Sequence, residues 1–270
     1  MPMMRFTKSL LVVPTTVVAA WTSSSSSQKF ARIATLHHSV MGSPGSGNDL
    51  VVRVLGVCGG IGSGKSYACQ TLVNELGCWA HLEADVIAHK VYEPKSQAVQ
   101  EIVREFGSRV LTDEGHVNRT RLGDIVFASP DQMTKLECIV WPHVKTEIEK
   151  LVQSYREQHV PTNKTPVLVV EAAVLIDAGW DDLLDGLWVV RAPEDQALER
   201  LQSQRGFTAA DAKTRIEAQT VRRGIGNLQQ EVDDGVVTCV ISNNATASEL
   251  KAQLAEALQD HSCWYKSPSI

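Results

Sequence analysis

Residues Gly59–Ser66 carry the pattern G-x-x-x-x-G-K-[ST], whose residue types and spacing suit the binding of nucleotide phosphates. Glycines let consecutive backbone N–H groups turn toward phosphate oxygens, and they leave no side chain in the way. Lys65 can reach the β- and γ-phosphates, and the Ser66 hydroxyl can bind Mg²⁺. The motif therefore predicts a site for ATP and Mg²⁺, with Lys65 as a catalytic residue and Ser66 as the metal ligand. The predicted nucleotide-binding residues are Gly60, Ile61, Gly62, Ser63, Gly64, Lys65, Ser66 and Tyr67.

A second group, Glu83-Ala84-Asp85, could act on the acceptor of the phosphoryl group. It lies at the end of a predicted strand, and ligands of parallel α/β sheets bind at the carboxyl ends of the strands. Asp85 can accept a proton from an attacking hydroxyl, which is the role of an Asp in other phosphoryl transferases. Alternatively, Asp85 caps a helix that starts at Val86. Spacing alone leaves both interpretations open.

The rest of the chain narrows the class of nucleotide-binding protein. Glu171 ends another apolar run and could hold Mg²⁺ through water, as a Walker B acid does. The chain contains no D-x-x-G, N-K-x-D or L-S-G-G-Q sequence, which argues against GTPases and ABC-type ATPases. One P-loop, about 220 residues after the N-terminal segment, and an Arg-containing helical segment late in the chain are typical of a small-molecule kinase.

Apolar, β-branched runs alternate along the chain with segments of helical periodicity. The predicted strands are 51–57, 79–84, 166–170, 187–190 and 236–241. The predicted helices are 67–76, 86–91, 97–106, 119–127, 131–139, 144–158, 194–204, 209–221 and 248–258. Because such alternation favours parallel βαβ units, the predicted fold class is α/β: a P-loop NTPase fold whose parallel sheet is flanked by helices.

Composition excludes several classes of protein. The chain has 270 residues, 43% of them hydrophobic, which is enough for a full-sized core. A formal net charge of -5 argues against a nucleic-acid partner, because nucleic-acid domains carry a basic surface. The sequence contains no run of eighteen apolar residues, so no ordinary membrane span is predicted. The six cysteines form no C-x-x-C pair, so most are expected to pack as small buried side chains.

The N-terminal segment differs sharply from the rest. Residues 1–48 include no Asp or Glu, and their charged residues are Arg5, Lys8, Lys29 and Arg32. This composition is typical of an organelle transit peptide, so 1–49 is predicted to be a targeting or disordered extension and 50–270 the folded domain. Import into mitochondria is the first prediction. A plastid reached through a bipartite signal, or a cytosolic protein translated from Met41, are the alternatives.

Five stretches resemble the dephospho-coenzyme A kinase family, and the resemblance spans about residues 52–258. The stretches are LGVCGGIGSGKS (55–66), EADVIAHKVYEP (83–94), NRTRLGDIVF (118–127), IVWPHV (139–144) and EAAVLIDAGW (171–180). The first is shared with many kinases, whereas the second and fifth are much narrower signals. Within the family, the chain is most similar to the kinase domain of the eukaryotic bifunctional coenzyme A synthase.

The resemblance implies transfer of the ATP γ-phosphoryl group to the ribose 3′-hydroxyl of dephospho-coenzyme A. It also implies a helical lid and a small helical coenzyme A-binding region after the second strand. Asp85 falls on the family's general base and Arg200 on a lid arginine, which makes both predicted catalytic residues. A kinase for another small acceptor, such as a nucleoside, and an inactive nucleotide-binding regulator are the alternatives. The sequence does not indicate an oligomeric state.

The chain departs from the family pattern at several positions. Glu83 stands where the family usually has Asp, and Cys58 replaces a Thr beside the P-loop. Trp141 occupies the place of a His in bacterial members, so a role for that His does not carry over. In the lid, Gln204-Arg205 replaces Arg-Asp, which moves the arginine about 100° around the helix axis.

Overall fold

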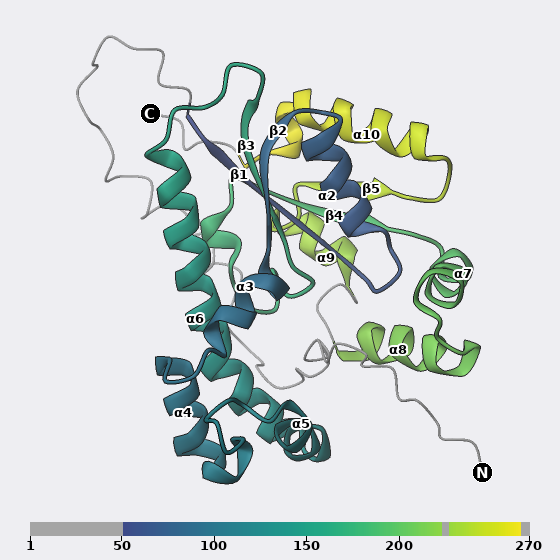
Figure 1. The fold of residues 1–270 in the computed structure, drawn as a ribbon. Coiled ribbons are helices and arrows are strands. Elements are labelled where there is room, and N and C mark those ends of the chain that lie inside the picture. Colours follow the sequence, from purple (N-terminus) through teal and green to yellow (C-terminus); the bar gives the residue numbers. More distant parts are fainter. Residues whose placement is uncertain (1–50, 223–226, 266–270) are drawn as a thin grey trace.

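The computed structural model describes residues 51–222 and 227–265, and a parallel sheet forms its centre (Figure 1). The strands are β1 (Arg53–Gly59), β2 (Cys78–Glu83), β3 (Thr165–Glu171), β4 (Gly186–Arg191) and β5 (Cys239–Ser242). They lie in the order β2-β3-β1-β4-β5, and every neighbouring pair is parallel. The predicted α/β class is thus confirmed. The predicted N-terminal extension lies outside the described residues.

Apolar side chains alternate between the two faces of the sheet, and each face packs against its own helices. Leu55 and Val57 join a cluster with α2 (Lys65–Asn74) and α10 (Ala247–Gln259). Val54 belongs to the opposite cluster, which includes buried residues of α3 (Ala84–Val91) and α6 (Pro130–Arg156). A sheet covered on both faces explains why its strands are continuous apolar runs.

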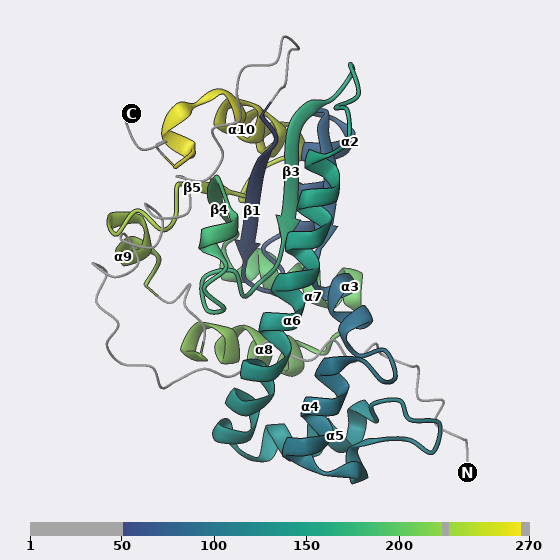
Figure 2. The same ribbon diagram turned by 90° about the vertical axis from the view of Figure 1, so that its left-hand side faces the viewer.

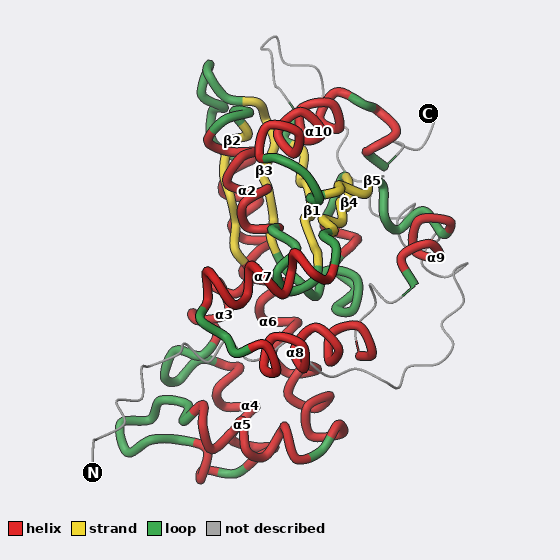
Figure 3. Tube along the Cα trace, turned by 90° about the vertical axis from the view of Figure 1, so that its right-hand side faces the viewer, coloured by secondary structure: helices red, strands yellow, loops and turns green. Residues whose placement is uncertain are grey.

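Two helical regions lie beyond the carboxyl ends of the strands. Figure 2 shows α4 (Gln97–Phe106) and α5 (Arg119–Ala128) packed around the start of α6 on that side of the molecule. Figure 3 shows α7 (Glu194–Arg205) next to the strand ends and α8 (Ala209–Arg222) further out. No helix within 51–222 and 227–265 has the length and hydropathy needed to cross a membrane.

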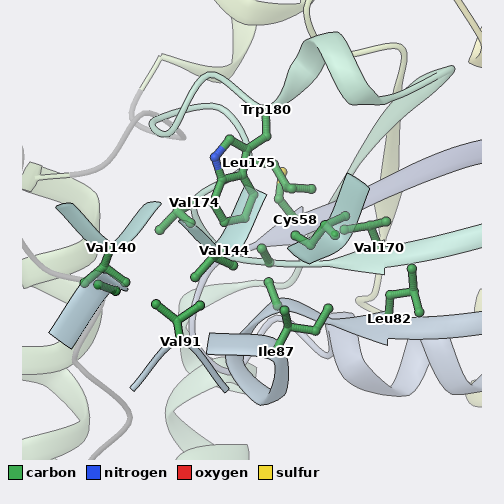
Figure 4. Close-up of a cluster of buried hydrophobic side chains, with 14 of the residues drawn as sticks. Cys58, Leu82, Ile87, Val91, Val140, Val144, Val170, Val174, Leu175 and Trp180 are labelled. Atoms are coloured by element: carbon green, nitrogen blue, oxygen red, sulfur yellow. The ribbon is translucent and has the colours of Figure 1, made fainter. Parts of the chain in front are cut away.

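The two helices predicted at 131–139 and 144–158 are one continuous helix, α6, so that prediction was wrong. Pro142 lies inside α6, where its ring removes a backbone hydrogen bond. Val140 and Val144, on either side of it, belong to the same buried cluster as Val91 and Val170 (Figure 4). The apolar stripe continues across the proline, and burial of this stripe keeps the helix intact.

Smaller differences concern element ends. The structure adds α9 (Leu228–Asp233), which the sequence did not predict and whose first turn is capped by the Asn227 side chain. The last strand begins at Cys239 and not at 236, because the backbone N–H groups of Val236 and Val237 both donate to the Glu231 carbonyl and close a turn.

Pro142→Ala should raise the free energy of unfolding. The substitution restores an N–H that can donate to the Cys138 carbonyl, and Pro142 is exposed, so no core contact is lost. A proline in a helix interior costs about 3 kcal/mol relative to alanine. The alanine variant has a more flexible unfolded chain, which reduces the gain in stability by up to about 1 kcal/mol. Urea denaturation should show a stabilisation of about 2–3 kcal/mol. A destabilised variant would mean that α6 is built around the proline.

Candidate functional site

The P-loop joins β1 to α2 with its two inner glycines in the left-handed region. Gly62 has φ 76° and Gly64 has φ 88°, a conformation that side chains rarely adopt. Gly64 is the N-cap of α2, so the helix starts at Lys65 and its free N–H groups point into the loop. The sequence pattern therefore produces the predicted strand–loop–helix geometry for binding phosphate.

Protein atoms crowd the glycines from behind. A Cβ at Gly62 would lie 2.8 Å from the Ala197 carbonyl oxygen, and one at Gly64 would overlap the Asn243 side-chain amide. The loop must have glycine there to pack against α7 and the segment after β5, as well as to leave room for phosphates.

Arg200, on α7, holds the P-loop from this rear side. Its Nη1 donates to the carbonyl oxygens of Gly62 and Ser63 at 3.2 and 3.3 Å, and its Nη2 donates to the Asn243 carbonyl at 3.0 Å. The Asn243 side-chain Nδ2 donates to the same Ser63 carbonyl at 2.8 Å. We call Arg200 and Asn243 the P-loop clamp. That Arg200 contacts phosphate stays a prediction, since its guanidinium lies against loop carbonyls here.

On the β3 side of the loop, Glu171 is the hub of the polar contacts. Its Oε1 accepts a hydrogen bond from Ser66 Oγ at 2.5 Å and lies 4.0 Å from Lys65 Nζ. Its Oε2 lies 2.9 Å from His81 Nε2. The register of β1 and β3 explains why Glu171 lies next to Lys65 and Ser66. Glu171 pairs with Val57, two residues before the P-loop begins. Lys65 and Ser66, two of the predicted phosphate-site residues, thus both approach one buried carboxylate.

These partners keep Glu171 ionised despite burial. Burial raises the pKa of a carboxyl group, but the hydrogen bonds from His81 and Ser66 and the charge of Lys65 outweigh it, so the pKa of Glu171 lies below its usual value. A buried, charged oxygen beside a serine hydroxyl is a fitting neighbour for a hard cation.

Asp85 lies at the carboxyl end of β2, in the first turn of α3, and its side chain is exposed. The helix begins at Ala84 with Glu83 as N-cap, so the interpretation of Asp85 as the cap of a helix starting at Val86 is wrong. β2 pairs with β3 so that Glu83 is opposite Glu171. Asp85 therefore belongs to the same edge of the sheet as the P-loop.

Several residues near the site have structural roles. Trp180 and Trp188 are buried in opposite clusters, and the Trp188 indole donates to the Cys263 carbonyl at 2.8 Å. Cys58 is buried, and burial together with the negative charge of Asp177 raises the pKa of its thiol to about 12. Cys58 is thus a packing residue and not a reactive thiolate.

Sequence reasoning missed His81 and Asn243. Both lie near the carboxyl ends of strands, β2 and β5, and that position was the available signal. Neither follows a motif, so only the folded chain brings them to Glu171 and the P-loop. The side chains of Arg222 and Arg223 lie outside the described residues.

Comparison with known proteins identifies a family. The family model for dephospho-CoA kinase matches residues 53–249. Curated dephospho-CoA kinases from Carboxydothermus hydrogenoformans and Thermobifida fusca are 32% and 34% identical to this chain, and the alignments cover 78% and 76% of it and 95% and 94% of those proteins.

Solved structures agree in fold. A Thermus thermophilus crystal structure aligns over 76% of this chain and 96% of its own with a TM-score of 0.58 and 23% identity. The dephospho-CoA kinase from Campylobacter jejuni aligns over 76% and 95% with a TM-score of 0.51 and 22% identity. The match of the family model over most of the folded part, together with these relatives, shows that the chain belongs to the dephospho-CoA kinase family.

Proposed function

We propose that this protein transfers the γ-phosphoryl group of ATP to the ribose 3′-hydroxyl of dephospho-coenzyme A, giving coenzyme A and ADP. The observation that carries the proposal is the arrangement of the P-loop, Glu171 and Asp85 on three neighbouring strand ends of a chain that the family model matches. ADP release measured across a panel of acceptors tests it. Dephospho-coenzyme A should be turned over far faster than nucleosides or shikimate-like alcohols, and a faster alternative acceptor would overturn the assignment.

The residues present fit ATP and Mg²⁺. The start of α2 offers backbone N–H groups and Lys65 to the phosphates. Ser66 Oγ and Glu171 Oε1 are oxygen ligands of the kind that Mg²⁺ prefers, and they are hydrogen-bonded to each other. Ser66 would therefore hold Mg²⁺ directly, and Glu171 would hold it through water. When bound, the ion neutralises charge on the phosphate oxygens.

Asp85 acts as the general base. It takes the proton of the 3′-hydroxyl as the oxygen attacks the γ-phosphorus, and the bond to the β–γ bridging oxygen breaks to leave ADP. Its exposure leaves it open to an acceptor that binds over α3, between the sheet edge and the α4–α5 region. The eukaryotic coenzyme A synthase likeness remains a prediction within this family.

Asp85→Asn should lower kcat at least about a hundredfold, since general-base catalysis contributes about 10²–10⁴-fold. Affinity for ATP should change little, because the P-loop and Lys65 bind the nucleotide. The measurement is steady-state kinetics with dephospho-coenzyme A, with nucleotide affinity measured separately. Glu83→Gln, which neutralises the carboxylate two residues away, is the matched control and should keep kcat within a few-fold. Equal kcat in Asp85→Asn and wild type would end the general-base role.

We propose that Arg200 is a catalytic residue of the lid. Its contacts in the P-loop clamp give it a second role, the positioning of the loop, and an experiment can separate the two roles. Arg200→Lys keeps the charge but cannot donate to the loop carbonyls and to Asn243 together. If positioning dominates, this variant should raise the KM for ATP about tenfold or more and lower the Tm of the free protein, with a smaller change in kcat.

If phosphate contact dominates, Arg200→Lys should instead lower kcat while the Tm of the free protein stays at the wild-type value. Asn243→Ala is the matched variant on the other half of the clamp, because it removes the Nδ2 donor and adds no charge change. A Tm unchanged in both variants would contradict the positioning role.

Residues 1–49 direct import into an organelle, with mitochondria as the first destination. A chain starting at Met41 should therefore keep the Tm and the kinase activity of the full chain, because the described core begins after it. A fluorescent reporter fused to residues 1–47 should leave the cytosol. Loss of activity on truncation would mean that the segment packs on the domain, and a cytosolic reporter would contradict import.

A further inference from the structure

Three side chains from different elements converge beneath the P-loop with ligand atoms suited to a transition metal. They are Cys69 on α2, His81 on β2 and Glu171 at the end of β3. One ligand atom of each, a sulfur, an imidazole nitrogen and a carboxylate oxygen, lies within 4.8 Å of the others. Thiolate, imidazole and carboxylate are ligands that Zn²⁺ accepts, whereas Mg²⁺ prefers oxygen alone. Among the described residues, this is the group of His, Cys, Asp and Glu side chains whose ligand atoms lie close enough together to hold one metal ion.

We propose that Cys69, His81 and Glu171 form a Zn²⁺ site beside the phosphate site, and that its occupancy inhibits the kinase. The inhibition rests on the proposed function, whereas the binding does not.

The two oxygens of Glu171 divide the two sites. Oε1 faces Ser66 and Lys65, and Oε2 faces His81 Nε2 at 2.9 Å. Zn²⁺ bound on the Oε2 side needs ligand atoms about 3.3–3.6 Å apart, from Zn–N and Zn–S bonds of about 2.0 and 2.3 Å in tetrahedral geometry. His81 and Glu171 must therefore separate by about half an ångström. The fourth position is left to water, as in other three-ligand zinc sites.

A neighbouring carboxylate suits His81 to the role. Glu83 Oε1 lies 3.9 Å from His81 Nδ1, on the ring side opposite Glu171. Metal-binding histidines usually direct their second ring nitrogen at such a carboxylate, which fixes the tautomer that leaves Nε2 free for the metal. Zn²⁺ binding would place the imidazole proton on Nδ1, toward Glu83.

Charge also balances within this buried group. Cys69 is fully buried, and His81 and Glu171 are 13% and 8% exposed. Burial, together with the negative charge of the neighbouring Glu171, raises the pKa of the Cys69 thiol well above its usual value. Zn²⁺ displaces the thiol proton to solvent, so the ion, one thiolate and one carboxylate sum to zero charge. Lys65 is the positive group that faces the site, from the Oε1 side.

Zn²⁺ bound at this site would weaken the interactions of Glu171 with its partners at the phosphate site. A carboxylate that shares its charge with Zn²⁺ accepts more weakly from Ser66 and attracts Mg²⁺-bound water less. Zn²⁺ is therefore expected to inhibit turnover even when Mg²⁺ and ATP are abundant.

The test of binding uses Co²⁺ as a spectroscopic probe on the full, reduced chain without nucleotide. One equivalent should give a thiolate-to-Co²⁺ charge-transfer band and the d–d bands of a four-coordinate ion, and Zn²⁺ should remove both. Cys69→Ala should lose the charge-transfer band. Cys78→Ala is the matched control, since Cys78 is an equally buried thiol outside the group, and it should keep the band.

His81→Gln provides a second variant if Cys69→Ala folds poorly, and it should weaken Zn²⁺ affinity at least tenfold. Glu83→Gln should weaken it about tenfold through the histidine alone. Absence of the band in wild type, or its persistence in Cys69→Ala through another thiol such as exposed Cys138, would overturn the site.

The test of inhibition measures ADP release at buffered free Zn²⁺, each variant relative to its own metal-free rate. The Zn²⁺ concentration for half inhibition should be at least tenfold higher in Cys69→Ala than in Cys78→Ala. Equal sensitivity would overturn the inhibitory role. If wild type showed no kinase activity, the proposed function would fail while the Co²⁺ spectra still decided the metal site.

Discussion

The hydrogen bond from Ser66 to Glu171 connects the two halves of the site, and it exists because β1 and β3 are parallel neighbours in a fixed register. Val57 pairs with Glu171, so the chain that leaves β1 forms the P-loop directly beside the carboxylate that ends β3. A slip of one residue in this pairing would move Glu171 to the opposite face of the sheet. Both strands are buried on both faces, so a slip would not expose apolar side chains, but it would exchange the two sets of core side chains and disrupt their packing against the helices on each face.

Support for the loop comes from segments far apart in the chain. The P-loop clamp joins α7 and the residue after β5 to carbonyl oxygens that the bent loop cannot satisfy internally. Carbonyls held at the rear leave the N–H groups turned toward the front, where phosphates bind. The same contacts couple the loop to α7, the helix that leads into α8. A change in the position of these helices would therefore be transmitted to the backbone of the phosphate site.

Local signals predicted the parts of the fold that depend on neighbouring residues. The glycine spacing predicted the loop, and alternating apolar runs predicted the parallel sheet with most strand and helix positions. Pro142 led to the wrong prediction of two helices. Its local cost to the helix is outweighed by burial of the apolar stripe of α6, because Pro142 lies on the exposed side of the helix. His81 and Asn243 were missed for a related reason: their partners are brought to them by strand order, which no local pattern contains.

Glu171 must remain charged while its surroundings change during the proposed reaction. Before nucleotide binds, Ser66, His81 and Lys65 together offset the cost of burying it, and none of the three alone has to do so. If Lys65 turns to the phosphates as proposed, the carboxylate would lose one cationic neighbour, and a hydrated Mg²⁺ held at Ser66 would supply another. His81 approaches from β2 and not from the loop, so the proposed reaction does not require it to leave Glu171. A carboxylate with one permanent partner and two exchangeable ones can follow the change of charge in the site without taking up a proton.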